Sequence, residues 1–221
     1  MAASILSLFR GAEDTEQEAY LSRFDDFHRR HAWVRLAPVE HVLAISDVHA
    51  DAAANLEWLK ALPAHPHDAL ILAGDISHDL NVIAQTLDIL VARFRHVFYG
   101  VGNHELWAMR SLDGFSDHEN SIEKYLAILE LATARGAHVA PALLGEDGAD
   151  GAVIAIIPMH SWYHSSFCGG EADTKGMTAM MDGAVDWPNF LADDKRQGFD
   201  KRRCSFFASA NRLLMSEIAP P

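Results

Sequence analysis

Basic residues are scarce in this chain: 18 Lys and Arg stand against 31 Asp and Glu, which gives a formal net charge of −13 at pH 7. A chain of this sign does not attract a phosphate backbone or an anionic surface, so we expect neither a long nucleic acid nor a membrane among its partners. Only two cysteines occur, Cys168 and Cys204. Two thiols make no disulfide framework and favour a cytoplasmic protein. Apolar runs stay short of the ~18 residues that span a bilayer, and residues 1–8 do not resemble a secretory signal.

Hydrophobic residues, by contrast, make up 49% of the chain and predict a real core. Apolar runs and helical periodicity alternate between residues 41 and 101. The pattern predicts strands at 41–46, 69–73 and 96–101, with helices at 52–62 and 80–94 between them. Nearly continuous apolar runs are typical of a parallel sheet covered on both faces. Right-handed crossovers would then bring the loops at the carboxyl ends of the strands together.

Outside this region the pattern is less regular. We predict a helix at 122–134 that ends near Gly136, and strands at 137–140 and 153–157. The irregular stretch after residue 160 is longer than an ordinary connection and suggests a cap or excursion. The domain organisation that we expect is an N-terminal arm or helix at 1–40, a core at 41–160, this cap at 161–200 and a C-terminal helix at 201–221.

Three polar segments follow the three predicted strands and contain metal-ligand residue types. They are Asp47-Val48-His49, Gly74-Asp75 and Gly102-Asn103-His104-Glu105, and Asp75 lies 28 residues from both Asp47 and Asn103. That spacing is about the length of one strand-helix-strand unit. The sequence therefore predicts that these segments meet at one edge of the sheet.

The residue types in these segments suit a pair of divalent cations. Asp47 and His49 offer an oxygen and an imidazole nitrogen, a mixed set that favours Mn, Fe or Zn over Ca. Asp75 can bridge two cations, and Asn103 offers an amide oxygen to the second. His104 stands beside them and can protonate a leaving oxygen or stabilise an oxyanion. Asp-x-His or Gly-Asp alone is weak evidence; the three segments together, in this order, are specific.

With these segments, the chain resembles the calcineurin-like metallophosphoesterase family over residues 41–105, and more loosely to about residue 165. The resemblance implies an α/β fold of four layers, α/β/β/α, and a centre of two metal ions. It implies metal roles for Asp47, His49, Asp75 and Asn103 and a catalytic role for His104. Residues 161–164, Ser-Trp-Tyr-His, are similar to a segment of a plant and protist branch of the family.

The chain also departs from the family pattern. His78 stands where the family has a carboxylate that orients the catalytic histidine, although Asp79 follows it. The Gly-His-x-His that completes the family's centre does not occur in this sequence. The histidines after His104 are His118, His138, His160 and His164; we expect His118 to be exposed and His138 to be structural, whereas His160 or His164 is a conceivable substitute ligand. We therefore expect one ion or weak binding, and a sandwich incomplete on its C-terminal side.

These observations favour a hydrolase that cleaves a phosphomonoester or phosphodiester through a metal-activated hydroxide, with Mn, Fe or Zn as the metal and Mn as the one to test first. A small phosphorylated molecule or a phosphoprotein is the expected substrate. The alternative is a degenerate family member that binds a partner or one metal ion without turnover. A nuclease is disfavoured by the net charge. Trp162, Tyr163 and Phe167 could line a cap over the leaving group, although ordinary packing explains them better.

Overall fold

The computed structural model describes residues 12–108, 118–145, 153–162, 184–188, 191 and 201–216. The chain divides into two compact units. The first contains residues 1–30, 160–183 and 187–221, and the second contains residues 31–159 and 184–186. The second unit carries all three polar segments.

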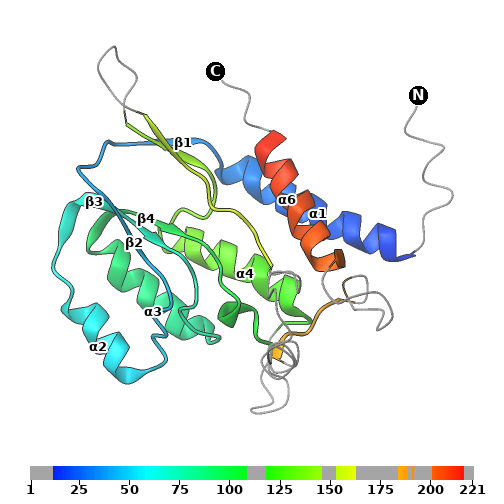
Figure 1. Cartoon of the computed structure of the whole chain (residues 1–221), viewed down its shortest axis with the longest axis horizontal. Coiled ribbons are helices and arrows are strands. Elements are labelled where there is room, and N and C mark those ends of the chain that lie inside the picture. The colour runs from blue at the N-terminus through cyan, green and yellow to red at the C-terminus, as the bar shows by residue number, and fades with distance from the viewer. Residues whose placement is uncertain are drawn as a thin grey trace, which may run out of the picture. The chain divides into compact units, whose positions relative to one another are not determined.

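The strand-helix alternation predicted between residues 41 and 101 is confirmed (Figure 1). Strands β2 (Val42–Ile45), β3 (His65–Leu72) and β4 (Phe94–Tyr99) form a parallel sheet in the order β2-β3-β4. Helices α2 (Ala53–Ala61) and α3 (Leu80–Val91) connect them. β3 begins four residues before its predicted start, because the polar residues at 65–68 hide the beginning of the strand from an apolar pattern.

Capping residues mark the ends of the helices in this unit. Asp79 caps α3 by accepting a hydrogen bond from the Asn81 N–H, and the apolar face of α3 packs against β4. Asn120 caps α4 (Ser121–Ala134) in the same way. Gly136 follows α4 with φ +86°, a left-handed conformation that suits glycine and ends the helix where it was predicted to end.

A second sheet contains β1 (Val34–Leu36), β5 (Ala142–Leu144) and β6 (Ile154–Ile156) in the order β1-β5-β6. The strand predicted at 137–140 is wrong, because His138 makes only an isolated bridge to Phe98 and the strand itself lies at 142–144. β1 lies in the stretch that was predicted to be an arm, and it pairs in parallel with β5. Three residues are too few for a periodic pattern to reveal.

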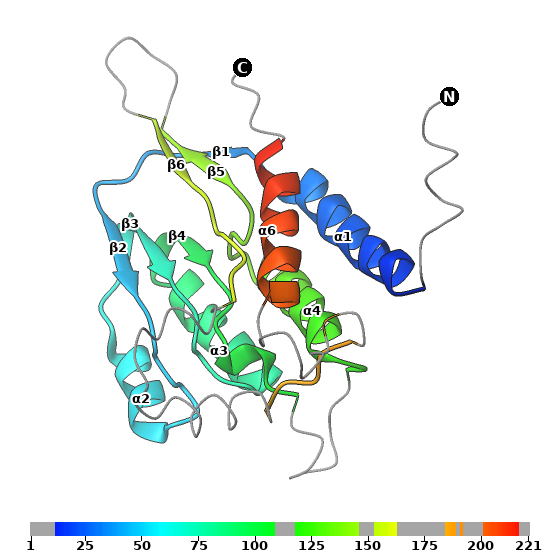
Figure 2. The same cartoon turned by 45° about the vertical axis from the view of Figure 1, so that its right-hand side comes forward.

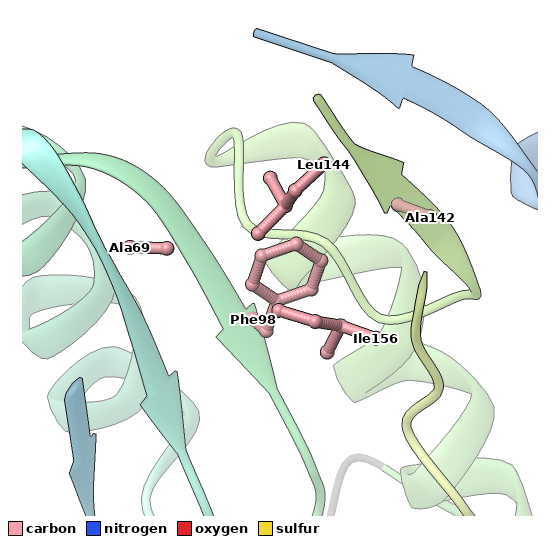
Figure 3. Packing of buried hydrophobic residues seen from close by; sticks show 5 residues of the cluster. All are labelled: Ala69, Phe98, Ala142, Leu144 and Ile156. Atoms are coloured by element: carbon pink, nitrogen blue, oxygen red, sulfur yellow. The ribbon is translucent and has the colours of Figure 1, made fainter. Parts of the chain in front are cut away.

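The two sheets pack against one another (Figure 2). Phe98 of β4 lies between Leu144 of β5 and Ile156 of β6 (Figure 3). Ala69 and Ala142 complete the buried cluster, with Leu36, Val39 and Ile71 partly buried against it. The α/β class and the sandwich of two sheets are thus as expected, with α2, α3 and α4 in the same unit.

Both sheets leave apolar residues exposed at an outer strand. Among the described residues β2 pairs only with β3, and Val42 and Leu43 are each 38% exposed. The expectation that every strand of the parallel sheet is covered is therefore wrong for β2. On β6, Ile154 is 47% exposed.

The first unit is built around two helices, α1 (Ala12–His31) and α6 (Lys201–Ser216). Phe24 of α1 and Phe206 of α6 meet edge to face, with their ring centroids 5.9 Å apart. Among the described residues no helix has the length and apolarity to cross a membrane. Most of the predicted cap at 161–200 lies outside the described residues, so the predicted domain division stays a prediction.

Candidate metal centre

The structure brings together three of the predicted ligands at the carboxyl ends of β2 and β3. One ligand atom from each of Asp47, His49 and Asp75 lies within 4.8 Å of the other two. Backbone hydrogen bonds continue the parallel pairing past the strand ends and align the two loops: the Asp47 N–H donates to Gly74 O at 3.2 Å, and the His49 N–H donates to Asp75 O at 3.0 Å. The ladder that forms the sheet therefore also sets the spacing of the ligands.

The backbone at all three residues is in the left-handed region. Asp47 has φ +55°, His49 has φ +40° and Asp75 has φ +56°. Such a conformation costs a non-glycine residue of order 1–3 kcal/mol and persists where the surrounding structure enforces it. Three such residues on two neighbouring loops indicate that the fold holds these side chains in the positions that a binding site requires.

Close backbone approach explains the two glycines that precede these residues. A Cβ added at Gly102 would lie 2.3 Å from Asp75 Oδ1 and 2.5 Å from Asp75 N. A Cβ added at Gly74 would lie 2.5 Å from Gly102 N, and Gly74 itself has φ +78°. Glycine at these two positions therefore permits a backbone approach that a larger residue would block.

Glu105 holds these loops together, a role that the sequence pattern did not reveal. Its carboxylate is fully buried. Oε2 accepts hydrogen bonds from the Asp75 N–H at 3.0 Å and the Gly102 N–H at 3.1 Å. Oε1 accepts from the Ile76 N–H at 2.7 Å and the Tyr99 hydroxyl at 3.1 Å. Burial raises the pKa of Glu105, and the hydrogen bonds from the backbone oppose that shift.

Asn103 and His104 both contact the Asp75 carboxylate. The His104 N–H donates to Asp75 Oδ1 at 3.0 Å. The Asn103 side-chain amide lies 3.3 Å from Asp75 Oδ2. That amide can donate through its nitrogen to the carboxylate, or turn its oxygen toward it and share a cation with it. The second arrangement is the one required by the predicted metal role of Asn103.

The His104 ring contacts the rings of both His49 and Trp107. Its centroid is 4.6 Å from that of His49 and 3.7 Å from that of Trp107. His104 Nδ1 is buried and has no hydrogen-bond partner among the described residues. Burial lowers the pKa of His104, and the negative charge of Asp75 partly opposes this. Asp79 does not orient the ring, because its side chain caps α3 instead.

Lys124 of α4 links the segments that contain His78 and Trp107. Its buried ammonium donates to the carbonyl oxygens of His78 and Trp107, both at 2.6 Å. Burial lowers the pKa of Lys124 to about 8. His78, at the position of the family's carboxylate, thus contributes a backbone oxygen to this link, and its ring lies 6.4 Å from that of Trp107.

The structure describes three of the four later histidines. His138 packs against Phe98, with ring centroids 5.2 Å apart, which agrees with a structural role. His160 lies in the first unit, with its Nε2 at 2.8 Å from the Nε2 of His28. His118 is half-buried rather than exposed. Trp162 packs edge to face on Trp187; His164, Tyr163 and Phe167 fall outside the described residues.

The donor set at the carboxyl ends fits divalent cations. Asp47, His49 and Asp75 combine two carboxylates with one imidazole, a set that suits Mn, Fe or Zn. Asp75 has both carboxylate oxygens directed at the neighbouring loop, one near His104 N and one near Asn103. For a second cation, the described residues offer Asp75 and Asn103.

The model of the calcineurin-like phosphoesterase family matches residues 40–162, which is more than half of the 221-residue chain. The chain therefore belongs to this family. Among curated proteins it is similar to the [acyl-carrier-protein] phosphodiesterase PptH of Mycobacterium tuberculosis, with 32% identity over 135 residues. That match covers 60% of this chain and 40% of the relative.

A solved structure gives the same relationship. The crystal structure of the phosphopantetheinyl hydrolase PptH from Mycobacterium tuberculosis aligns with a TM-score of 0.58 and 26% identity. The alignment covers 81% of this chain and 64% of that one. The chain thus spans less than two thirds of the length of the relatives it matches.

Proposed function

We propose that this chain hydrolyses phosphoester bonds with the help of divalent cations held at the carboxyl ends of β2 and β3. The observation that carries the proposal is the convergence of Asp47, His49 and Asp75 on left-handed backbone. Membership of the phosphoesterase family supports it.

Each side chain has a defined task in this proposal. Asp47, His49 and Asp75 would hold one cation, and Asp75 and Asn103 would hold the second. Bound cations would supply Lewis-acid charge that neutralises phosphate oxygens and lowers the pKa of a water molecule. Glu105 fixes the Asp75 backbone through its hydrogen bonds, so that the carboxylate needs little reorganisation when a cation or a phosphate arrives.

His104 would protonate the leaving oxygen. Its backbone N–H is tied to Asp75, so the ring has a fixed position beside His49. A half-buried ring with a lowered pKa releases a proton readily. An anionic phosphate bound next to the ring would favour the charged form at the moment when the proton is needed.

For the substrate class, we propose a phosphodiester. The relatives named above are a phosphodiesterase of acyl carrier protein and a phosphopantetheinyl hydrolase. A phosphopantetheinyl group attached to an acyl carrier protein is therefore the first substrate to test. The net charge of −13 disfavours a long nucleic acid as the substrate. A cytoplasmic setting and Mn as the working metal belong to the same proposal.

The test is hydrolysis of bis(p-nitrophenyl) phosphate and p-nitrophenyl phosphate in the presence of Mn²⁺, followed by release of phosphopantetheine from acyl carrier protein by mass spectrometry. We expect Asp75→Asn to abolish turnover and His104→Gln to reduce kcat by about 10²–10⁴-fold. The matched control is Asp88→Asn, which removes an exposed carboxylate paired with Arg135 on the surface. Equal activity in wild type and Asp75→Asn would refute the proposal.

A specific observation favours a second candidate, the degenerate member that binds one cation without turnover. The described residues supply only Asp75 and Asn103 to the second cation, and His78 replaces a carboxylate of the family pattern. Metal analysis separates the two: this candidate predicts one ion per chain that is lost in Asp47→Asn, with no hydrolysis of either ester.

A further inference from the structure

A second group of metal-ligand side chains lies at the opposite end of the parallel sheet. Glu40 and His41 come directly before β2, and Asp68 lies in β3. Val42 pairs with Ala69 in the parallel register, so the preceding residues, His41 and Asp68, are also neighbours across the two strands. Figure 2 shows β2 and β3 running in the same direction, which places their starts together.

The side chains of this group are oriented by their own contacts. His41 Nδ1 lies 2.9 Å from Asp68 Oδ1. His65 Nδ1 lies 3.0 Å from Asp68 Oδ2. The ring of His65 stacks on Phe94, with centroids 4.9 Å apart and planes within 3° of parallel. Phe94 therefore fixes His65, and His65 fixes the Asp68 carboxylate with Oδ1 facing His41.

Glu40 is placed next to this pair by the backbone. Its N–H donates to His67 O at 2.8 Å, which continues the pairing of the two segments beyond the ladder. Ligand atoms of Glu40, His41 and Asp68 all lie within 4.8 Å of one another. For a tetrahedral ion with ligands at about 2.0–2.2 Å, the ligands stand roughly 3.2–3.6 Å apart, so only small side-chain rotations are needed.

We propose that Glu40, His41 and Asp68 form a second binding site for a divalent transition-metal cation, with zinc as the best match. One imidazole and two carboxylates leave a fourth position for water, and His65 acts as the partner that orients a ligating carboxylate. Hydrogen bonds from His65, and then from His41, lower the pKa of Asp68, which keeps it in the form that binds metal.

This site is independent of the centre at the carboxyl ends. His41 precedes Asp47 by six residues along extended chain, which separates the two sites by about 20 Å at 3.3 Å per residue. A shared ion is therefore excluded. The cation would link the start of β2 to β3, and β2 is an outer strand whose described partner is β3 alone. Its effect is thus to secure that strand.

The experiment measures Zn²⁺ binding by isothermal titration calorimetry in the full chain that carries Asp75→Asn, which weakens the first centre. We expect one zinc ion per chain to remain. Adding His41→Ala or Asp68→Asn should weaken this binding at least tenfold. Adding His67→Ala is the matched control: it removes an exposed imidazole from the same segment, and zinc binding should not change.

Thermal unfolding provides a second readout. Zinc at 100-fold excess over its Kd should raise the Tm of the Asp75→Asn protein by about 5–10 °C, and His41→Ala should remove this rise. The His41 side chain is 67% exposed, so the variant should fold as well as its parent without zinc. If His41→Ala changes neither the zinc affinity nor the Tm shift, the three side chains form a hydrogen-bonded surface cluster that does not bind zinc. That result would overturn the proposal. Because the test contains no turnover, its result is independent of the proposed phosphoesterase activity.

Discussion

Replacement of Glu105 is the sharpest test of how this site is built. The carboxylate is buried and accepts four hydrogen bonds, three of them from the backbone N–H groups of Asp75, Ile76 and Gly102. Glu105→Ala would leave these donors and the Tyr99 hydroxyl without their acceptor. A buried donor that loses its partner costs about 1–3 kcal/mol, and water entering the space would recover part of it. We expect a loss of about 3–5 kcal/mol in the free energy of unfolding.

Glu105→Gln separates the charge from the hydrogen bonds. The amide keeps one acceptor oxygen, so two of the four donors retain a partner and the other two face an NH₂ group. Burial already raises the pKa of Glu105, which means that removal of the charge recovers some of the desolvation cost. We therefore expect a smaller loss, about 1–3 kcal/mol.

The effect should extend to the metal centre, because the Glu105 carboxylate holds the left-handed backbone of Asp75. We expect Mn²⁺ affinity to fall at least tenfold in Glu105→Ala, by isothermal titration calorimetry, and unfolding in urea to report the stability. Glu57→Gln is the control: this exposed carboxylate pairs with Lys60 on α2, and such pairs contribute less than about 1 kcal/mol. Stability within 1 kcal/mol of wild type, with unchanged Mn²⁺ affinity, would refute the reasoning.

Two further predictions address close packing and acid stability. Gly102→Ala should weaken Mn²⁺ binding at least tenfold, because its Cβ would lie 2.3 Å from Asp75 Oδ1. Gly100→Ala is the control and should bind Mn²⁺ normally, because no atom of the described residues lies within 4 Å of the new Cβ. Equal Mn²⁺ affinities in the two variants would contradict this prediction. Burial, and then the charge of His28, lowers the pKa of His160 to about 3, whereas the pKa of histidine in the unfolded chain is ~6.5. As the pH falls from 6.5 to 3, the unfolded state therefore binds a proton that the folded state does not, and the free energy of unfolding decreases. Between pH 7 and 5 the loss of stability is about 2 kcal/mol. Urea unfolding at the two pH values should show this loss in wild type and not in His160→Gln. Equal losses in the two proteins would disprove the prediction.

Much of the parallel sheet and its ligand-bearing loops could be predicted from the sequence. Apolar runs and helical periodicity are local properties, so they located β2, α2, β3, α3 and β4 in order. Because parallel strands bring their carboxyl ends together, the order alone placed Asp47, His49 and Asp75 at one edge. The end of α4 near Gly136 could also be predicted locally, since it depends on one residue that tolerates positive φ.

The remaining features depended on partners far apart in the chain. β1 is only three residues long and exists as a strand because β5 pairs with it. β5 begins at Ala142, where Ala142 and Leu144 are buried in one cluster with Phe98. Glu105 is an ordinary charged residue in the sequence, and only tertiary burial among the N–H groups of two loops makes it the support of Asp75. The sequence by itself determined which residue types stand at the strand ends. Only the tertiary structure decided which buried groups hold them, because burial and hydrogen bonding between loops far apart in the chain are not periodic along the sequence.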